Sequence, residues 1–522
     1  MQRLERSLAT RVFALRDDRL TLAKSLSVAA FVVPLAIYAA SLLPGVGFWD
    51  TAEMQTVPYI FGVAHPPGFP AFVMLGYFFS HVFAFGNVAW RLSFMSALAL
   101  AGAAWLIFRA LQDEDVHPIL ACLCAWAFAF GYVVWTRATR AEVHALALFF
   151  MSAAVWSALR ARASGAIRPL YICALSLGLA AATHPVVIWI VPGTLVLLAP
   201  AFAKLWRTSQ GRAQAVRVTA IGLGLAIAPL LLYLYMPLRS AIVTAQQLDP
   251  TRALGLPPGQ AFWDYGHTVD PHRFILQITG AQFPTHDALR AVLSLSSYPT
   301  FAAVFASKAW SEFGIVVLML AALGTVQLFF KDRIRAFGLA LIILAGVPFA
   351  LSYLIEIDYD RYLLTAYWGL ALLAGIGAQA LLNLARGRPQ HRVALVLLAI
   401  ILAESIAYEF KVNRDVWTQR HDRSGEAFID RILRETPPRS VVDAPWVFEA
   451  PLAYAAYVEH RAGGRLVTSS DPRDADSRLG IWIKQRPVYV IYFEIGPGRV
   501  PGLRFVPVDL SIPALYRVEA RD

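Results

Sequence analysis

The residues best suited to chemistry lie in one short segment, residues 49–70, which reads W-D-T-A-E-M-Q-T-V-P-Y-I-F-G-V-A-H-P-P-G-F-P. It holds Asp50, Glu53 and His65 directly after the first long apolar stretch of the chain. Titratable groups at the edge of a membrane are costly to place there and usually serve catalysis or transport. We therefore interpret the rest of the chain as a scaffold for this segment.

A purely structural interpretation of the same residues also exists. Asp50 followed by Glu53 matches a helix start, with Asp50 as N-cap and Glu53 reaching back as in a capping box. The stretch from His65 to Pro70 predicts a rigid turn with a helix beginning near Pro70, because each proline removes a donor and favours extended geometry before it. The two interpretations are compatible, and the pattern leaves open whether His65 is a ligand, a base or a hydrogen-bond donor.

Composition assigns the scaffold to the polytopic α-helical membrane proteins. The chain has 522 residues, of which 58% are hydrophobic and 16% charged, and its mean hydropathy is +0.54, values that no soluble globular protein of this length shows. The net charge of +11 comes mostly from Arg and Lys in short gaps between apolar segments. That distribution indicates membrane topology and excludes a nucleic-acid footprint.

The apolar segments predict about eleven transmembrane helices. An Arg-rich stretch precedes the first, 25–43, which we expect to be an uncleaved helix with a cytoplasmic N-terminus. The segment 69–85 is expected to be an outer-leaflet or re-entrant helix, because a span there would place the basic segment 202–217 outside. The other spans are expected near 92–110, 118–135, 142–160, 170–183, 186–201, 218–237, 311–330, 336–354, 363–384 and 393–409.

The charge pattern supports this topology and singles out a second group of residues. Predicted cytoplasmic gaps are rich in Arg and Lys, as the positive-inside tendency requires. The predicted outer gaps also carry charged or titratable residues, namely Arg137, Arg140, Glu142, His144, His184, Arg239 and Arg361. Arginines on that side indicate an anionic partner such as Glu142 or a lipid phosphate, whose geometry the guanidinium fork matches. Interfacial snorkelling of the arginines and a hydrogen-bonded core histidine at 184 are the structural alternatives.

Residues 411–522 have the composition of a soluble domain. Short strands are expected at 440–444, 465–470 and 488–493, with helices at 447–461 and 474–485 between them. This alternation predicts a small α/β domain with a partly parallel sheet. An odd number of spans places it outside the membrane, beside the first outer loop 45–91 and the large outer loop 238–298, while residues 1–410 form the transmembrane module.

Several motifs resemble one family along nearly the whole chain. W-D-T-A-E followed by A-H-P-P-G-F-P resembles the D-S-G-E and H-P-P-G-Y-P pattern of a bacterial membrane family that also includes transmembrane protein 260, a protein O-mannosyltransferase. That family belongs to the C-type (GT-C) glycosyltransferase superfamily. R-A-E-V, T-H-P, Y-M-P-L-R-S, I-T-G-A-Q-F, D-Y-D-R-Y and R-E-T-P-P-R-S-V-V-D extend the likeness. Ala52 departs from it, since the family usually has Gly there.

The resemblance implies an integral-membrane enzyme that moves a sugar from a polyprenyl-phosphate donor to an extracytoplasmic hydroxyl with inversion. Asp50 would be the general base and Glu53 its helper or alternative. Arg137, Arg140, Arg239 and Arg361 are the cations available to the leaving phosphate, and His65, Glu142 and His184 complete the expected substrate site. A divalent metal bridging Asp50 and the phosphate is an option, although the sequence shows no dedicated ligand set.

Other functions and several details stay open at this stage. A secondary transporter or flippase-like protein would place ionisable groups and broken helices near the midplane with internal repeats, whereas here charges gather at outer ends. A non-catalytic membrane subunit is the third option. The expected location is the inner (plasma) membrane, in contact with its lipids. The motifs name neither the sugar, a mannose or another hexose, nor the acceptor, a protein, glycan or lipid.

Overall fold

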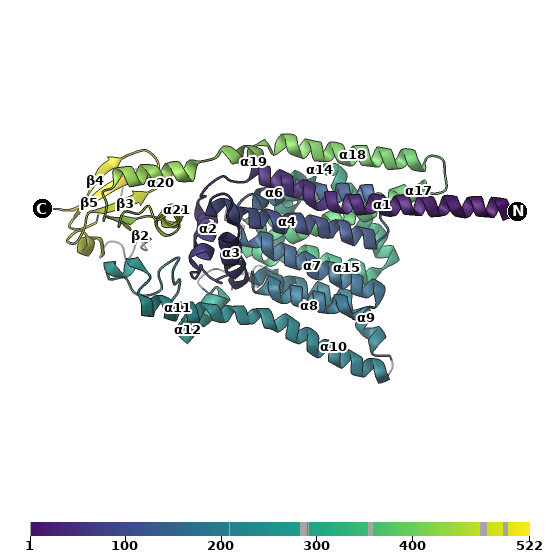
Figure 1. The fold of residues 1–522 in the computed structure, drawn as a ribbon, viewed down its shortest axis with the longest axis horizontal. Helices are drawn as coiled ribbons and strands as arrows, with labels where there is room; N and C mark the ends of the chain where they lie inside the picture. Colours follow the sequence, from purple (N-terminus) through teal and green to yellow (C-terminus); the bar gives the residue numbers. More distant parts are fainter. Residues whose placement is uncertain are drawn as a thin grey trace.

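The computed structural model describes residues 2–207, 209–281, 290, 292–352, 359–469, 478–493 and 500–521. Long apolar helices form a bundle, and short helices, loops and a five-stranded sheet gather at one end of it (Figure 1). The N-terminus lies at the opposite end of the long axis (Figure 1). We call the end that carries the sheet the domain end.

The bundle helices are apolar over most of their surface, as expected for segments surrounded by lipid and by one another. In chain order the bundle elements are α1 (Gln2–Ser41), α4 (Val88–Asp113), α5 (Pro118–Ala129), α6 (Tyr132–Ala138), α7 (Val143–Ser164), α8 (Ile167–Ala181), η1 (Pro185–Ile190), α9 (Val191–Leu205), α10 (Ser209–Ile227), η2 (Ala228–Leu234), α11 (Tyr235–Gln246), η4 (Leu295–Ser297), α14 (Tyr298–Lys331), α15 (Arg333–Ile343), η5 (Leu344–Gly346), α16 (Val347–Ser352), η6 (Tyr359–Leu363), α17 (Leu364–Leu384) and α18 (His391–Val412). Helices α10 and α18 run along opposite edges of the bundle (Figure 1).

Within the described residues, nine helices are long and apolar enough to cross a membrane, and the bent pair α5–α6 makes a tenth. The expected number was about eleven, and the difference is the segment 170–183. The segment corresponds to α8, whose 15 residues extend about 22 Å, short of the roughly 30 Å of a hydrocarbon core. Helix α8 still carries the chain back along α7 to the domain end, since His184 after α8 contacts His144 at the start of α7. The segment 69–85 contains α3 (Pro70–Val82), which at 13 residues is also too short for a span, as predicted.

The break between α5 and α6 has a local cause. The two helices meet at an angle of 72°, and a Cβ at Gly131 would lie 2.3 Å from a carboxylate oxygen of Glu312 on α14. That carboxylate accepts hydrogen bonds from the backbone nitrogens of Val133 at 2.8 Å and Val134 at 3.2 Å. Glu312 thus satisfies the free N–H groups at the start of α6, and α6 carries Arg137 in its last turn.

At the domain end, the helices and strands come from three parts of the chain. The elements are α2 (Trp49–Ile60), α3, η3 (Pro250–Leu254), α12 (Pro271–Thr279), α19 (Arg414–Thr418), η7 (Gln419–His421), α20 (Ser424–Glu435), β1 (Val441–Asp443), α21 (Trp446–Tyr457), β2 (Leu466–Thr468), β3 (Val488–Tyr492), β4 (Leu503–Asp509) and β5 (Ala514–Ala520). The strand order is β2-β1-β3-β5-β4. The pairs of β1 with β2 and β3 are parallel, and β5 is antiparallel to both β3 and β4.

The three expected strands correspond to β1, β2 and β3, and the expected helix 447–461 corresponds to α21. The expected helix 474–485 lies partly outside the described residues. The sequence patterns did not predict β4 and β5, which complete the sheet. Strand β1 lies between β2 and β3 and is parallel to both. Its carboxyl end leads through Ala444 and Pro445 into α21, and α21 packs against α2. This packing brings the sheet domain to the segment that holds Asp50.

Candidate active site

The segment with Asp50 and Glu53 forms a helix, but its start differs from the expected capping box. The N-cap of α2 is Phe48, and no side chain caps this helix end. Asp50 is the second residue of α2, so its carboxylate is directed to other parts of the chain. The alternative interpretation of Asp50 as an N-cap with Glu53 reaching back is wrong, because both carboxylates have tertiary partners that compete with the helix end.

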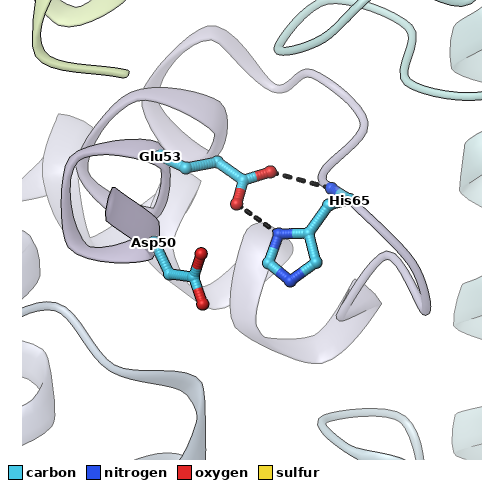
Figure 2. A group of neighbouring side chains, drawn as sticks. All are labelled: Asp50, Glu53 and His65. Carbon is cyan, nitrogen blue, oxygen red and sulfur yellow. Dashed lines mark hydrogen bonds and ion pairs between the residues drawn. The ribbon is translucent and has the colours of Figure 1, made fainter. Parts of the chain in front are cut away.

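Glu53 is fully buried and binds His65 twice, as Figure 2 shows. One carboxylate oxygen accepts the backbone N–H of His65 at 2.8 Å, and the other pairs with its Nδ1. The predicted turn after His65 is confirmed, since Gly68 donates its N–H to the His65 carbonyl at 2.8 Å and has a φ of +90°. Burial lowers the pKa of His65, but the Glu53 charge and hydrogen bond outweigh it and raise the pKa to about 8.

The carboxylate of Asp50 lies beside this pair (Figure 2) and is held from two distant parts of the chain. Arg361 on η6 donates from Nη1 to Oδ2 at 3.2 Å, and Trp446 of α21 donates from Nε1 to Oδ1 at 3.3 Å. Burial raises the pKa of Asp50, but the charges of His65 and Arg361 exceed that effect and lower the pKa overall. Asp50 is therefore ionised at neutral pH, the state that a general base needs.

A second ionic network lies around Arg137. Its Nη1 donates to Glu142 Oε2 at 3.2 Å and its Nη2 donates to Asp360 Oδ1 at 3.1 Å, while Lys308 Nζ donates to the other oxygen of Asp360 at 3.2 Å. Glu142 also binds the Nδ1 of His144 at 2.8 Å. This network is covalently linked to the Asp50 group, because Asp360, which binds Arg137, is followed directly by Arg361, which binds Asp50.

His184 connects the two histidine-containing parts of the site through ring contacts. Its ring stacks on Phe69 with centroids 5.8 Å apart and lies 4.4 Å from the ring of His144. Its Nδ1 accepts the backbone N–H of Val186 at 3.1 Å. Burial, together with His144 and Arg361, lowers the pKa of His184 well below its ordinary value. His184 is thus a buried, neutral histidine with a hydrogen bond at Nδ1. Its expected role in substrate binding stays a prediction.

The remaining two predicted arginines have different surroundings. Arg239 on α11 donates from Nη2 to the carbonyl of Ile60 at 3.1 Å and lies over the ring of Trp263 at 5.8 Å, so it binds the far end of α2. Arg140 lies between α6 and α7, partly exposed. Among the predicted cations, Arg361 contacts Asp50 directly.

Asp50, Glu53 and His65 also form a group whose donor atoms lie within 4.8 Å of one another. Two carboxylates and a neutral imidazole are a donor set that suits zinc or manganese. A protonated imidazole does not ligate a metal, and Arg361 occupies one oxygen of Asp50. The ion-paired form seen here and a metal-bound form are therefore alternatives for the same three side chains.

Sequence reasoning missed four residues of this site. These residues are Trp446, Asp360, Lys308 and Glu312, and the segments around Trp446, Lys308 and Glu312 carry no local sign of the contact they make. Asp360 alone had a usable signal, since it stands in the D-Y-D-R-Y motif next to Arg361. Lys308 and Glu312 lie one turn apart on α14, and only the fold shows that Lys308 reaches Asp360 and that Glu312 reaches the start of α6.

Comparisons with known proteins find similarity in sequence and in fold. Residues 50–209 match the family described as the Protein O-mannosyl-transferase TMEM260 N-terminal domain. The chain is 33% identical over 124 residues to Protein O-mannosyl-transferase tmem260 of Dictyostelium discoideum, covering 23% of this chain and 15% of the relative. It is 24% identical over 433 residues to the Mus musculus TMEM260, covering 80% of this chain and 58% of the relative. The chain thus spans less than two thirds of either relative.

A solved structure shares the architecture over nearly its whole length. ArnT from Cupriavidus metallidurans in the apo state covers 95% of this chain and 98% of its own, with a TM-score of 0.57 and 13% identity. The same protein bound to undecaprenyl phosphate gives a TM-score of 0.56 at 12% identity, with 94% and 97% coverage. This likeness concerns the fold. In sequence the chain is similar to the TMEM260 proteins, with the family match at residues 50–209, and in fold it is similar to ArnT.

Proposed function

We propose that the protein transfers a hexose from a polyprenyl-phosphate donor to a hydroxyl group of a protein on the extracytoplasmic side of the membrane. The observation that carries the proposal is Asp50, an ionised carboxylate held by Arg361 and Trp446 at the domain end of the bundle. The family match at residues 50–209 supports a protein acceptor and mannose as the sugar. The ArnT fold, known with undecaprenyl phosphate bound, supports a polyprenyl carrier.

The reaction needs one base and one cationic group. The acceptor oxygen attacks the anomeric carbon, the bond from that carbon to the phosphate oxygen breaks, and the proton of the hydroxyl passes to Asp50. The leaving polyprenyl phosphate keeps the electron pair, so a guanidinium beside it stabilises the developing charge. Arg361, which binds Asp50, is the first candidate for this role, and the partly exposed Arg140 is the second. A single displacement inverts the anomeric centre.

The other side chains position these two groups. Glu53 holds His65, and His65 contributes a positive charge that keeps Asp50 ionised. Asp360 holds Arg137 and Lys308, which fixes η6 and therefore Arg361. An ordered arrangement of this kind is what electrostatic stabilisation of a transition state requires, because donors that are already oriented need no rearrangement during the reaction.

The test uses the purified full-length protein, a radiolabelled mannosyl polyprenyl phosphate and a peptide rich in Ser and Thr. Asp50→Asn should lower the turnover by about 100-fold or more, the scale of general-base loss, while donor binding stays within a few-fold. Expression should be unchanged, since Asp50 caps no helix. Asp113→Asn is the matched control. Asp113 pairs with Arg160 at the end of α4 that lies away from the domain end, so this variant should keep full turnover.

Two results would contradict the proposal. If Asp50→Asn folds and transfers sugar at the rate of the unchanged protein, Asp50 is not the base. If the unchanged protein transfers no hexose to any hydroxyl acceptor, the chain is a transporter or a non-catalytic subunit. Mass spectrometry of envelope proteins and lipid-linked glycans, with and without the gene, separates a protein acceptor from a glycan or lipid acceptor.

A further inference from the structure

Trp446 is the residue through which the sheet domain reaches the base. It is the first residue of α21, which follows β1 after Ala444 and Pro445. Its indole Nε1 donates to Asp50 Oδ1 at 3.3 Å, although 396 residues separate the two in the chain. The contact therefore joins the membrane module to the C-terminal domain at the carboxylate that takes the proton in the proposed reaction.

The indole is held by aromatic rings from two other segments. The ring of Phe262 stacks on it with centroids 5.4 Å apart and an interplanar angle of 7°. His65 and Tyr265 make edge contacts with centroids at 6.2 Å and 6.3 Å. Offset and edge-to-face contacts of this kind favour defined ring orientations. The direction of the Nε1–H bond is thus set by the large outer loop and by the turn after α2.

Phe262 is itself fixed against the first outer loop. Its side chain is 2% exposed and its φ is +71°, a backbone conformation that a bulky residue adopts only when its surroundings impose it. The Phe262 carbonyl lies so close to Gly62 that a Cβ on that glycine would be 1.8 Å away from it. The stack of Phe262 on Trp446 is therefore built into the fold by a glycine of the α2–α3 connection.

The two hydrogen-bond donors on Asp50 bind different oxygens of its carboxylate. Arg361 binds Oδ2 from the membrane module, and Trp446 binds Oδ1 from the sheet domain. A carboxylate bound through one oxygen alone can rotate about χ2, whereas donors on both oxygens fix its plane. Holding the base within a narrow range of orientations increases the rate of the chemical step by a large factor, because misplaced reacting groups raise the activation barrier.

We propose that Trp446 is a positioning residue that orients the Asp50 carboxylate, so that the C-terminal domain completes the active site of the membrane module. This inference rests on the proposed function. Trp446 acts through its N–H donor, and its ring serves to aim that donor. The sheet domain then belongs to the catalytic unit, and its docking on α2 decides whether the base is correctly oriented.

Trp446→Phe tests this inference because it keeps a ring on Phe262 and removes the N–H donor. It should lower kcat by about 10- to 100-fold, the equivalent of one hydrogen bond to a charged group, and leave the KM for the donor nearly unchanged. Trp310→Phe is the control, since Trp310 is 56% exposed on α14. In an Asp50→Ala background, Trp446→Phe should leave the residual rate nearly unchanged, because the carboxylate that Trp446 orients is already absent.

The outcomes separate this inference from the proposed function. An unchanged kcat in Trp446→Phe overturns the positioning role. The role is also overturned if the loss of kcat in the double variant equals the product of the losses in the two single variants, since Trp446 would then act independently of Asp50. If the unchanged protein transfers no sugar, the proposed function fails. Fluorine NMR of 5-fluorotryptophan-labelled protein then still tests the contact: the resonance lost in Trp446→Phe should shift in Asp50→Ala, and an unshifted resonance contradicts the hydrogen bond.

Discussion

Arg361 donates a hydrogen bond from Nη1 to Oδ2 of Asp50 at 3.2 Å, across 311 residues of sequence. The preceding residue, Asp360, accepts from Arg137 and Lys308. One 3-10 turn, η6, thus binds the base through Arg361 and two cations of the bundle through Asp360. The position of Asp50 relative to its cation is therefore determined by how α6 and α14 hold this turn.

The first prediction concerns Arg137, whose side chain is 7% exposed between two carboxylates. Arg137→Ala leaves Glu142 and Asp360 buried without their shared cation, and removal of one partner of a buried ion pair costs about 3–5 kcal/mol. We expect a clear drop in melting temperature in detergent, together with lost transfer. Arg207→Ala, at an exposed position at the other end of the bundle, should change neither quantity.

Arg137→Lys refines this test. A lysine keeps the charge but cannot bind both carboxylates with a fork, so it should recover part of the stability. If Arg137→Ala melted with the unchanged protein and lost only donor affinity, Arg137 would be a phosphate ligand, as the sequence pattern alone suggested, and its support of η6 would be of minor importance.

Local sequence patterns were sufficient for some of the site. The turn from His65 to Gly68 and the start of α3 at Pro70 follow from proline and glycine chemistry that acts within a few residues. The bundle follows from long apolar runs. The capping box at Asp50 and Glu53 was wrong because capping is a weak local preference, and His65, Arg361 and Trp446 offer both carboxylates stronger partners. Contacts such as Trp446 with Asp50 depend on the packing of α21 on α2, and no pattern in either segment indicates it.

The second prediction concerns pH. The pKa of His65 is raised from 6.5 to about 8, so the pair with Glu53 stabilises the fold fully below pH 6.5 and loses this contribution as the pH rises through about 8. The melting temperature of the unchanged protein should exceed that of His65→Gln by a margin that shrinks over this range. His421→Gln, at an exposed position, should show no such margin. A margin for His65→Gln that is constant with pH would exclude the imidazolium–carboxylate pair.

The third prediction concerns divalent metals. Because the raised pKa keeps His65 protonated and Arg361 holds Asp50, a dication must displace both interactions to bind. We expect transfer to continue unchanged after dialysis against EDTA. The opposite finding, a loss of activity that manganese or zinc restores and that Glu53→Gln also causes, would establish Asp50, Glu53 and His65 as a metal centre. Metal analysis of the purified protein by mass spectrometry gives an answer independent of activity.

The last prediction concerns topology, on which the placement of Asp50 depends. Arginine-rich gaps predict that the α17–α18 connection is cytoplasmic, and the chain termini lie at opposite ends of the bundle (Figure 1). A cysteine in place of Ser424, exposed at the start of α20, should react with a membrane-impermeant maleimide in cells whose inner membrane is intact. A cysteine in place of Arg386, exposed between α17 and α18, should react only after permeabilisation. The native cysteines Cys122, Cys124 and Cys173 are buried, so they should react little with the maleimide and give a low background. The reverse labelling pattern would put Asp50 on the cytoplasmic side, against the prediction from the charge distribution. It would refute the extracytoplasmic reaction proposed for this site.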